Sequence, residues 1–443
     1  MKIMRHKSLK QLFFFNLLLV VLYPTILSAQ TDSLSLSKLL TQQPEIKSVT
    51  PISNNIFPEK YVVKVSQEVD WGNASAGQYE ERVIVCFRGY DLPTVLVTEG
   101  YFASYALSPY YDEELSTMFY ANLIVCEYRY FGESVPKECN WDYLTVDNSL
   151  KDLHHVREIF GRIFQGKWIS TGISKGGQTT MFYRATYPED VDVSVSYVAP
   201  LNKGVEDGRH EPFLNKKVGK SSDRLKIQKA QEELLSRKSR LLPRFEAYCK
   251  SANLQFQDSY STIYDYCIFE FPFAFWQWGT SVTTIPSHDS TDEEWFSYFM
   301  KISEPNYFSC PSEFTPFFVQ AARELGYYGY SRKGLTNLCD VKNTHGYLRR
   351  LMLPNELQDI KFDKSLYKRT VKYLKRNDPR HIFIYGEVDP WSASGVAPWL
   401  DCSKKKNMKI FIQPNGSHKA RIGNMPDKMR EEIVDILTKW LTE

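Results

Sequence analysis

The chain has 443 residues, of which 43% are hydrophobic and 14% aromatic, so it can bury a large core and is not a disordered tail. Its 55 basic and 52 acidic residues leave a formal net charge of +3, which excludes a strong overall field for nucleic acid. The sequence also lacks a recognisable nucleic-acid motif, so we expect no nucleic-acid partner.

The N-terminus has the organisation of an export signal. Basic residues within the first ten positions are followed by the apolar run 12–23 and by small residues ending at Ala29. This order predicts a signal peptide over residues 1–29, with a retained membrane anchor as the alternative. Beyond residue 30 no apolar run is long enough to cross a bilayer, so we expect a secreted or periplasmic protein with no stable membrane insertion after cleavage.

Export would place the eight cysteines in an oxidising compartment, where disulfides persist. Cys86 and Cys126 lie in strand-like runs and are expected to be buried as small apolar residues. The best disulfide candidates are in the loop-rich middle of the chain: Cys249, Cys267, Cys310 and Cys339. Because the cysteines lack the paired spacing of a zinc site, we predict no metal and no cofactor.

The first part of the chain alternates between strand and helix patterns. Strand-like runs occur at 61–65, 82–88, 94–98 and 123–128, and a helix capped by Asp147 follows with apolar residues at three-to-four spacing from Leu150 to Phe160. Further strands are expected at 168–173 and 191–198, on either side of a helix ending at Tyr187. Strands alternating with helices predict a mostly parallel, buried sheet.

Residues 203–372 interrupt this pattern. The basic run 203–244 and the segments 293–300 and 314–325 favour helices, and we interpret the basic residues as solvated helix faces rather than a site for an anionic partner. The aromatic stretch 269–278 is either a substrate pocket or the core of a lid. Strands at 381–385 and 408–412 and a helix at 427–441 then complete the sheet domain. We therefore expect a sheet core from 30–202 and 373–443, with a helical lid inserted at 203–372.

A G-x-S-x-G sequence lies between the strand at 168–173 and the helix after it, as Gly172-Ile173-Ser174-Lys175-Gly176. This order is typical of a nucleophile elbow, in which small residues permit a strained turn that exposes the serine hydroxyl. The sequence thus favours the α/β-hydrolase fold, with Ser174 as the nucleophile.

A serine nucleophile needs a histidine base and a carboxylate that orients it. In α/β-hydrolases the acid and then the histidine follow late strands. Asp389 comes directly after the strand at 381–385, with Glu387 as its close competitor, and His418 follows the next strand. The predicted catalytic triad is therefore Ser174, Asp389 and His418.

The oxyanion of the tetrahedral intermediate needs backbone donors. We expect one from the N-H of Lys175, the residue after the nucleophile, and the second from Tyr101 in the loop after the strand at 94–98. The charge of the Lys175 side chain is not required for this role and is expected to be solvated.

Together these motifs resemble the secreted prolyl tripeptidyl aminopeptidases, which are similar to lysosomal Pro-X carboxypeptidase. The resemblance extends from about residue 60 to the end and includes the elbow, the 127–132 and 143–145 segments, Gly386-Glu387-Val388-Asp389-Pro390-Trp391 and Gly416-Ser417-His418. It implies a serine exopeptidase that acts on peptide substrates and releases tripeptides from free N-termini, with proline before the cut. Ser417 stands where the lysosomal relatives have a second histidine, which favours the aminopeptidase.

An aminopeptidase of this kind needs a carboxylate for the substrate's ammonium group. Glu99, beside the oxyanion loop, ranks first, with Glu270 as a further candidate, whereas Glu127 is expected to pair with Arg129. The aromatic stretch, including Phe271 and Trp276, could supply an apolar pocket for a proline ring. A carboxylesterase or lipase of the same fold and a non-catalytic exported binding protein stay open as alternatives, and the sequence predicts no oligomeric state.

Overall fold

The computed structural model describes residues 35–443, so the expected signal peptide lies outside the described residues. A nine-stranded sheet has the order β1-β2-β3-β5-β4-β6-β7-β8-β9. The strands are β1 Ile46–Pro51, β2 Glu59–Glu68, β3 Gln78–Phe87, β4 Thr94–Val97, β5 Asn122–Cys126, β6 Trp168–Ile173, β7 Val193–Tyr197, β8 His381–Gly386 and β9 Met408–Gln413. Neighbours are parallel from β5 to β9 and antiparallel from β1 to β5. The predicted α/β class is therefore confirmed, with a mixed sheet.

The central strands are short and buried on both faces. All four residues of β4 are buried, and they pair in parallel with β5 on one side and β6 on the other. Helices on both faces explain why these strands read as continuous apolar runs rather than as alternating patterns. Because parallel strands end at the same edge of a sheet, the loops after β4, β6, β8 and β9 meet at one edge.

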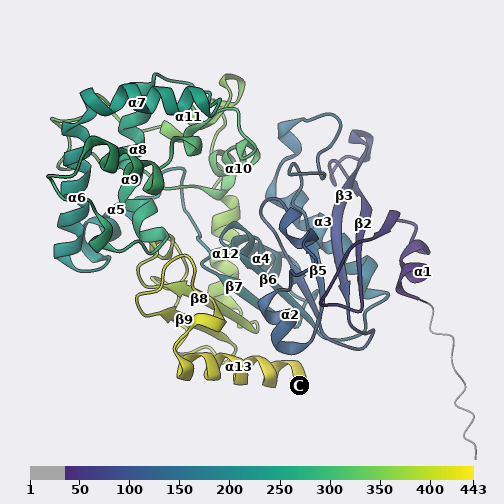
Figure 1. Cartoon of the computed structure of the whole chain (residues 1–443). Helices are drawn as coiled ribbons and strands as arrows, with labels where there is room; N and C mark the ends of the chain where they lie inside the picture. The colour runs from purple at the N-terminus through teal and green to yellow at the C-terminus, as the bar shows by residue number, and fades with distance from the viewer. Residues whose placement is uncertain (1–34) are drawn as a thin grey trace, which may run out of the picture.

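Helices cover the two faces of the sheet (Figure 1). One face carries α1 Leu36–Thr41, α3 Val146–Gly161, α4 Lys175–Thr186 and α12 Ser365–Arg376, and the other carries α2 Glu114–Phe119 and α13 Asp427–Thr442. The predicted helix at 427–441 is thus confirmed. Thr145, rather than Asp147, caps α3, because the Thr145 side chain accepts a hydrogen bond from the Asn148 N-H and Asp147 already lies in the first turn.

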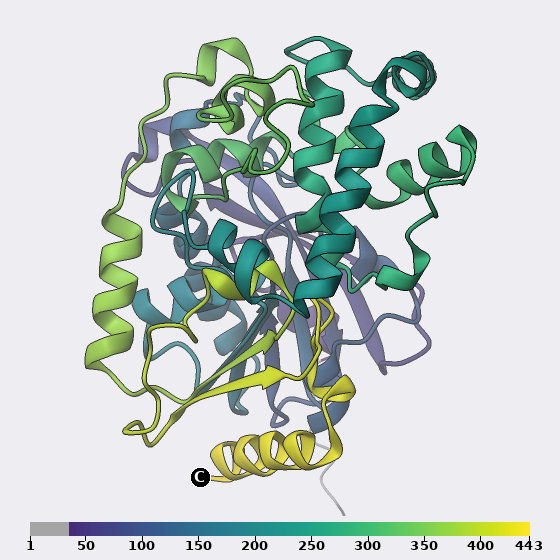
Figure 2. The same ribbon diagram turned by 90° about the vertical axis from the view of Figure 1, so that its left-hand side faces the viewer.

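Residues 203–364 form a separate group of helices, which we call the helical unit (Figure 2). It contains α5 His210–Pro212, α6 Ser221–Ser236, α7 Lys238–Ser251, α8 Tyr260–Gln277, α9 Asp292–Ile302, α10 Thr315–Gln320 and α11 Tyr347–Met352. The expected division at residue 372 falls inside α12, whose Leu366 and Leu374 pack in the core of the sheet.

The helical unit is built around α8, which is buried along most of its length. Pro272 inside this helix has no N-H for the carbonyl of Ile268, and the Gln231 side chain of α6 donates to that carbonyl instead, at 2.7 Å. The aromatic stretch expected at 269–278 is therefore mostly part of a central helix.

The four disulfide candidates are free thiols, so that expectation is wrong. Cys249, Cys267, Cys310 and Cys339 are all buried, and the Cys310 sulfur accepts a hydrogen bond from Gln257 while the Cys339 thiol donates to the Val341 carbonyl. Cys86 and Cys126 are buried in the sheet core, as predicted. Over residues 35–443, helices with the length and apolar character to cross a bilayer are absent.

Candidate active site

Ser174 lies at a sharp turn between β6 and α4. Its backbone has φ 57° and ψ −118°, a strained conformation that non-glycine residues rarely adopt and that is found at functional turns. The turn depends on its small neighbours, since a side chain at Gly172 would lie 2.4 Å from the Gly176 carbonyl and one at Gly177 would lie 2.7 Å from the Tyr197 carbonyl. The local geometry is that of the predicted elbow.

Asp389 and His418 meet at the same edge of the sheet. Asp389 follows β8 and is fully buried, and its Oδ2 is 2.8 Å from Nδ1 of His418, which follows β9. The other carboxylate oxygen accepts from the Trp391 N-H at 3.1 Å. This arrangement fixes the histidine ring through Nδ1 and leaves Nε2 for proton transfer.

Glu387, the competing acid, is exposed and has a different partner. Its Oε2 accepts a hydrogen bond from the Asn415 N-H at 2.7 Å, which ties the loop after β8 to the loop after β9. Glu387 therefore supports the shape of the edge without contacting the histidine ring.

Ser174 is partly exposed, and its hydroxyl makes no hydrogen bond within the described residues. The side chain of His418 is 6% exposed and lies beside the half-exposed ring of Trp278, at 6.1 Å between ring centroids. Catalytic hydrogen bonds are often loose before substrate binds, so this open geometry is compatible with a base that approaches the serine in the complex.

The loop after β4 lies directly against the start of α4. A side chain at Gly100 would be 3.0 Å from the Gly176 N atom and even closer to the Lys175 side chain. The backbone of Lys175 and that of the Gly100–Tyr101 segment are thus neighbours beside Ser174, as an oxyanion site needs.

The side chain of Lys175 is buried rather than solvated, so the sequence-based expectation is wrong. Its Nζ donates to the Gly100 carbonyl at 2.5 Å and lies 3.4 Å from the centroid of the Tyr128 ring. Burial lowers the pKa of Lys175 well below its ordinary value, and the nearby Glu99 partly opposes this shift. Aromatic side chains and one carbonyl here replace the water that usually surrounds a lysine at a helix start.

Both carboxylate oxygens of Glu99 are occupied. Oε1 accepts from the Tyr105 hydroxyl, and Oε2 accepts from the Gly100 N-H at 3.2 Å. Burial raises the pKa of Glu99, although the hydrogen bond from Tyr105 and the charge of Lys175 oppose the increase. Each oxygen of Glu99 therefore already has a protein donor, and the Lys175 amine acts on the charge of the carboxylate.

Glu127 is fully buried and pairs with Arg82 rather than with Arg129. Its remaining contacts are protein donors, including the Ala103 N-H at 3.1 Å and the Glu133 N-H at 2.7 Å. Glu127 therefore has the structural role that the sequence predicts, but its ion-pair partner is Arg82 instead of the predicted Arg129.

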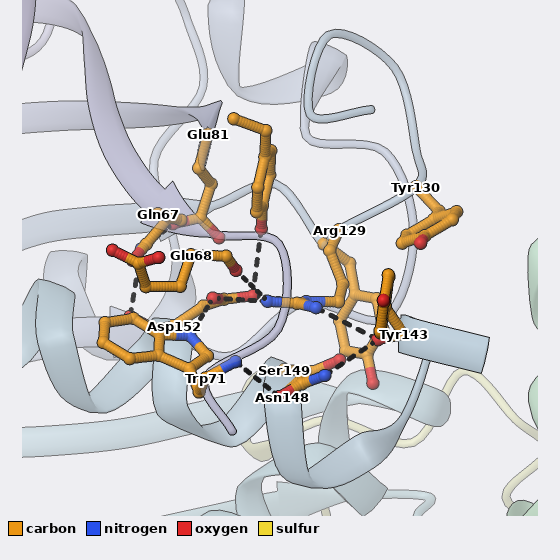
Figure 3. Close-up of polar contacts among 12 residues, drawn as sticks. Gln67, Glu68, Trp71, Glu81, Arg129, Tyr130, Tyr143, Asn148, Ser149 and Asp152 are labelled. Carbon is orange, nitrogen blue, oxygen red and sulfur yellow. Dashed lines mark hydrogen bonds and ion pairs between the residues drawn. The ribbon is translucent and has the colours of Figure 1, made fainter. Parts of the chain in front are cut away.

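Arg129 instead forms a two-point ion pair with Asp152 of α3, at 2.6 and 2.8 Å (Figure 3). Asp152 also accepts from the Trp71 ring nitrogen and the Tyr79 hydroxyl, while Arg129 donates to the backbone carbonyls of Glu68, Val69 and Tyr143. This buried network joins α3 to the β2–β3 hairpin behind the site.

Glu270 projects from α8 and is 6% exposed. Its Oε2 accepts hydrogen bonds from the hydroxyls of Tyr328 and Tyr330, each at 2.8 Å. Burial raises the pKa of Glu270 to about 7, while the two tyrosine hydrogen bonds oppose the increase. The tyrosines were not predicted, although the run from Tyr327 to Tyr330 is a visible aromatic cluster in the sequence.

The two aromatic candidates on α8 lie within the helical unit. Phe271 is fully buried and packs on Phe275 and Tyr298, so it belongs to the core of this unit. Trp276 is 8% exposed, and its ring lies against Gly219. Trp391 also connects α8 to the catalytic edge, at 5.1 Å from Phe273 and 6.5 Å from His418 between centroids.

Comparison with known proteins identifies the family of this chain. The model of the PS-10 peptidase S37 family matches residues 48–440. The chain belongs to the peptidase S37 family. A curated relative, prolyl tri/tetrapeptidyl aminopeptidase from Streptomyces mobaraensis, is 26% identical over 395 residues, which cover 86% of this chain and 79% of the relative. The S37 assignment and this relative identify the chain as a serine peptidase.

Two solved structures are more distant from this S37 member. Proline iminopeptidase from Mycobacterium smegmatis is 13% identical with a TM-score of 0.39, over 85% of this chain and 99% of that chain. VinJ is 13% identical with a TM-score of 0.41, over 83% of this chain and 96% of that chain.

Proposed function

We propose that this S37 peptidase is a secreted exopeptidase that releases short peptides from free N-termini through Ser174, Asp389 and His418. Tripeptides with proline before the cut are the expected products. The observation that carries the proposal is the 2.8 Å contact between His418 Nδ1 and the buried Asp389, at the sheet edge where the strained Ser174 turn is exposed.

The proposed chemistry proceeds through an acyl-enzyme. Ser174 Oγ attacks the scissile carbonyl while His418 takes its proton, and Asp389 stabilises the resulting imidazolium. The backbone N-H groups of Lys175 and Tyr101 hold the oxyanion. His418 then protonates the departing amine, and water hydrolyses the ester by the same steps.

The aminopeptidase specificity draws on the S. mobaraensis relative, whose name describes removal of tri- and tetrapeptides with a prolyl preference. The secreted location draws on the pattern of residues 1–29 alone. Membership of a peptidase family favours this function over the carboxylesterase, lipase and binding-protein alternatives.

The proposal is tested with an X-Y-Pro chromogenic substrate in unblocked and N-acetylated forms, with product masses measured on longer peptides. We expect cleavage of the unblocked form, release of tripeptides, and complete loss of cleavage and of fluorophosphonate labelling in Ser174→Ala. Asp389→Asn should lower kcat by about 10⁴-fold, as expected for loss of a triad acid. Glu387→Gln is the matched control and should retain most of the activity. Full activity in Ser174→Ala would overturn the proposal.

A further inference from the structure

A carboxylate that binds a substrate ammonium group must offer a free oxygen and must not already be paired with a cation. Glu99 is the weaker candidate, because a protein donor already contacts each of its oxygens and the Lys175 amine acts on its charge. Glu127 fails both conditions because it contacts Arg82 and several donors. Of these three candidates, Glu270 is the one with a carboxylate oxygen still free to accept a hydrogen bond.

Glu270 meets both conditions. Its two tyrosine donors share Oε2, whereas Oε1 has no hydrogen-bond partner in residues 35–443 and still reaches the accessible surface. The groups that act on its charge are the two tyrosines and burial, with no lysine or arginine among them. A desolvated carboxylate with one open oxygen is a suitable site for an incoming cation.

The geometry of α8 gives the axial spacing between Glu270 and the point where this helix meets the backbone of His418. The last residue of this helix, Gln277, accepts a hydrogen bond from the His418 N-H through its carbonyl, at 2.9 Å. Glu270 is two helical turns earlier, which corresponds to about 10 Å at 1.5 Å per residue. An extended peptide covers about 10 Å with three residues but only about 7 Å with two.

Packed aromatic rings connect the two ends of this distance, and they are nearly fully buried. Tyr328, which donates to Glu270, stacks on Phe273 at 3.8 Å between centroids. Both rings form T-shaped contacts with Trp391, at 5.1 and 5.2 Å between centroids, and Trp391 in turn approaches His418.

We infer that Glu270 binds the free α-ammonium group of the substrate, and that its spacing from His418 along α8 selects a three-residue product. The inference rests on the proposed function and makes it more specific. One residue of the helical unit would then determine both which end of the peptide is bound and how many residues are released. Glu270 replaces Glu99 as the leading anchor because of its open Oε1.

The test compares wild type, Glu270→Gln and Glu304→Gln on matched unblocked and N-acetylated X-Y-Pro substrates. Glu304 is a matched control, because it is an exposed carboxylate of the helical unit that also accepts from a tyrosine hydroxyl. In Glu270→Gln we expect kcat/KM on the unblocked substrate to fall by about 100-fold or more, the scale of a lost charged hydrogen bond. The preference for the unblocked over the acetylated form should fall towards one, whereas Glu304→Gln should keep the wild-type preference.

A second measurement uses free peptides with proline at positions two, three and four. Wild type should release mainly tripeptides, and Glu270→Gln should lose this selectivity for product length. Fluorophosphonate labelling and the melting temperature establish that the variant is folded with a reactive serine. Wild-type preference and product length in a labelled Glu270→Gln variant would overturn the inference while leaving the proposed peptidase intact. Failure of the wild type to cleave any unblocked peptide would instead overturn the proposed function.

Discussion

At the residue scale, Lys175 links the two sides of the expected oxyanion site. Its backbone N-H belongs to one side, and its Nζ holds the Gly100 carbonyl on the other at 2.5 Å. A buried lysine that follows the nucleophile therefore acts as a positioning residue for the loop after β4. Glu99 and the face of Tyr128 favour its charged form, but burial outweighs them and keeps the Lys175 pKa well below its ordinary value.

Lys175→Met keeps the length of the side chain but removes the donor to Gly100. We expect kcat for the tripeptidyl substrate to fall by about 10- to 100-fold with a smaller change in KM, because a misplaced oxyanion donor weakens binding of the transition state more than that of the substrate. Lys167→Met, at the other end of β6 and partly exposed, is the control and should leave both constants near wild type. An unchanged kcat in Lys175→Met would contradict the positioning role.

At the scale of elements, one buried ion pair joins α3 to the segment after β5, and hydrogen bonds from its two members reach the β2–β3 hairpin. Asp152 accepts from Arg129 through both oxygens and from Trp71 and Tyr79 (Figure 3). Asp152→Asn would leave the guanidinium buried without its counter-charge, so we expect a loss of about 3–5 kcal/mol in the free energy of unfolding. Asp147→Asn on the same helix breaks an exposed pair with Arg369 and should cost about 1 kcal/mol or less. Equal losses in denaturant unfolding would contradict this difference.

The sequence predicts the strands of this sheet domain correctly where the local run of apolar residues determines them. The runs at 94–98 and 381–385 correspond to β4 and β8 within one residue at each end. In contrast, β1 was missed because it is an exposed edge strand whose burial pattern has no apolar alternation. The predicted partner of Glu127, Arg129, is also wrong, because the pairing of Glu127 with Arg82 depends on how β3 and β5 lie beside each other.

For the candidate site, the sequence likewise predicts some residues and misses others. Ser174, Asp389 and His418 each follow a recognisable strand, so chain order alone predicts that they share an edge. The burial of Lys175 and the open oxygen of Glu270 depend on rings from distant segments, notably Tyr128 and Tyr328. Those contacts come from tertiary packing, which neither a motif nor a spacing specifies.

At the scale of the whole molecule, the helical unit contacts the catalytic edge through the end of α8. Gly279 follows this helix with φ 68°, and a side chain there would lie 3.1 Å from Cβ of Ser417, the neighbour of His418. The position of the base is therefore coupled to the position of the helical unit. Any change that separates them should affect catalysis more than stability.

Gly279→Val tests this coupling. The added methyl groups should push the loop that carries His418, and a shift of about 1 Å in a catalytic group can lower kcat by about 100-fold. Gly346→Val is the matched control, because Gly346 has a similar φ of 73° but nothing within 4 Å of an added side chain. Both variants should lose similar melting temperature from backbone strain, while only Gly279→Val loses kcat. Equal kcat values in the two variants would mean that the helical unit and the base are positioned independently.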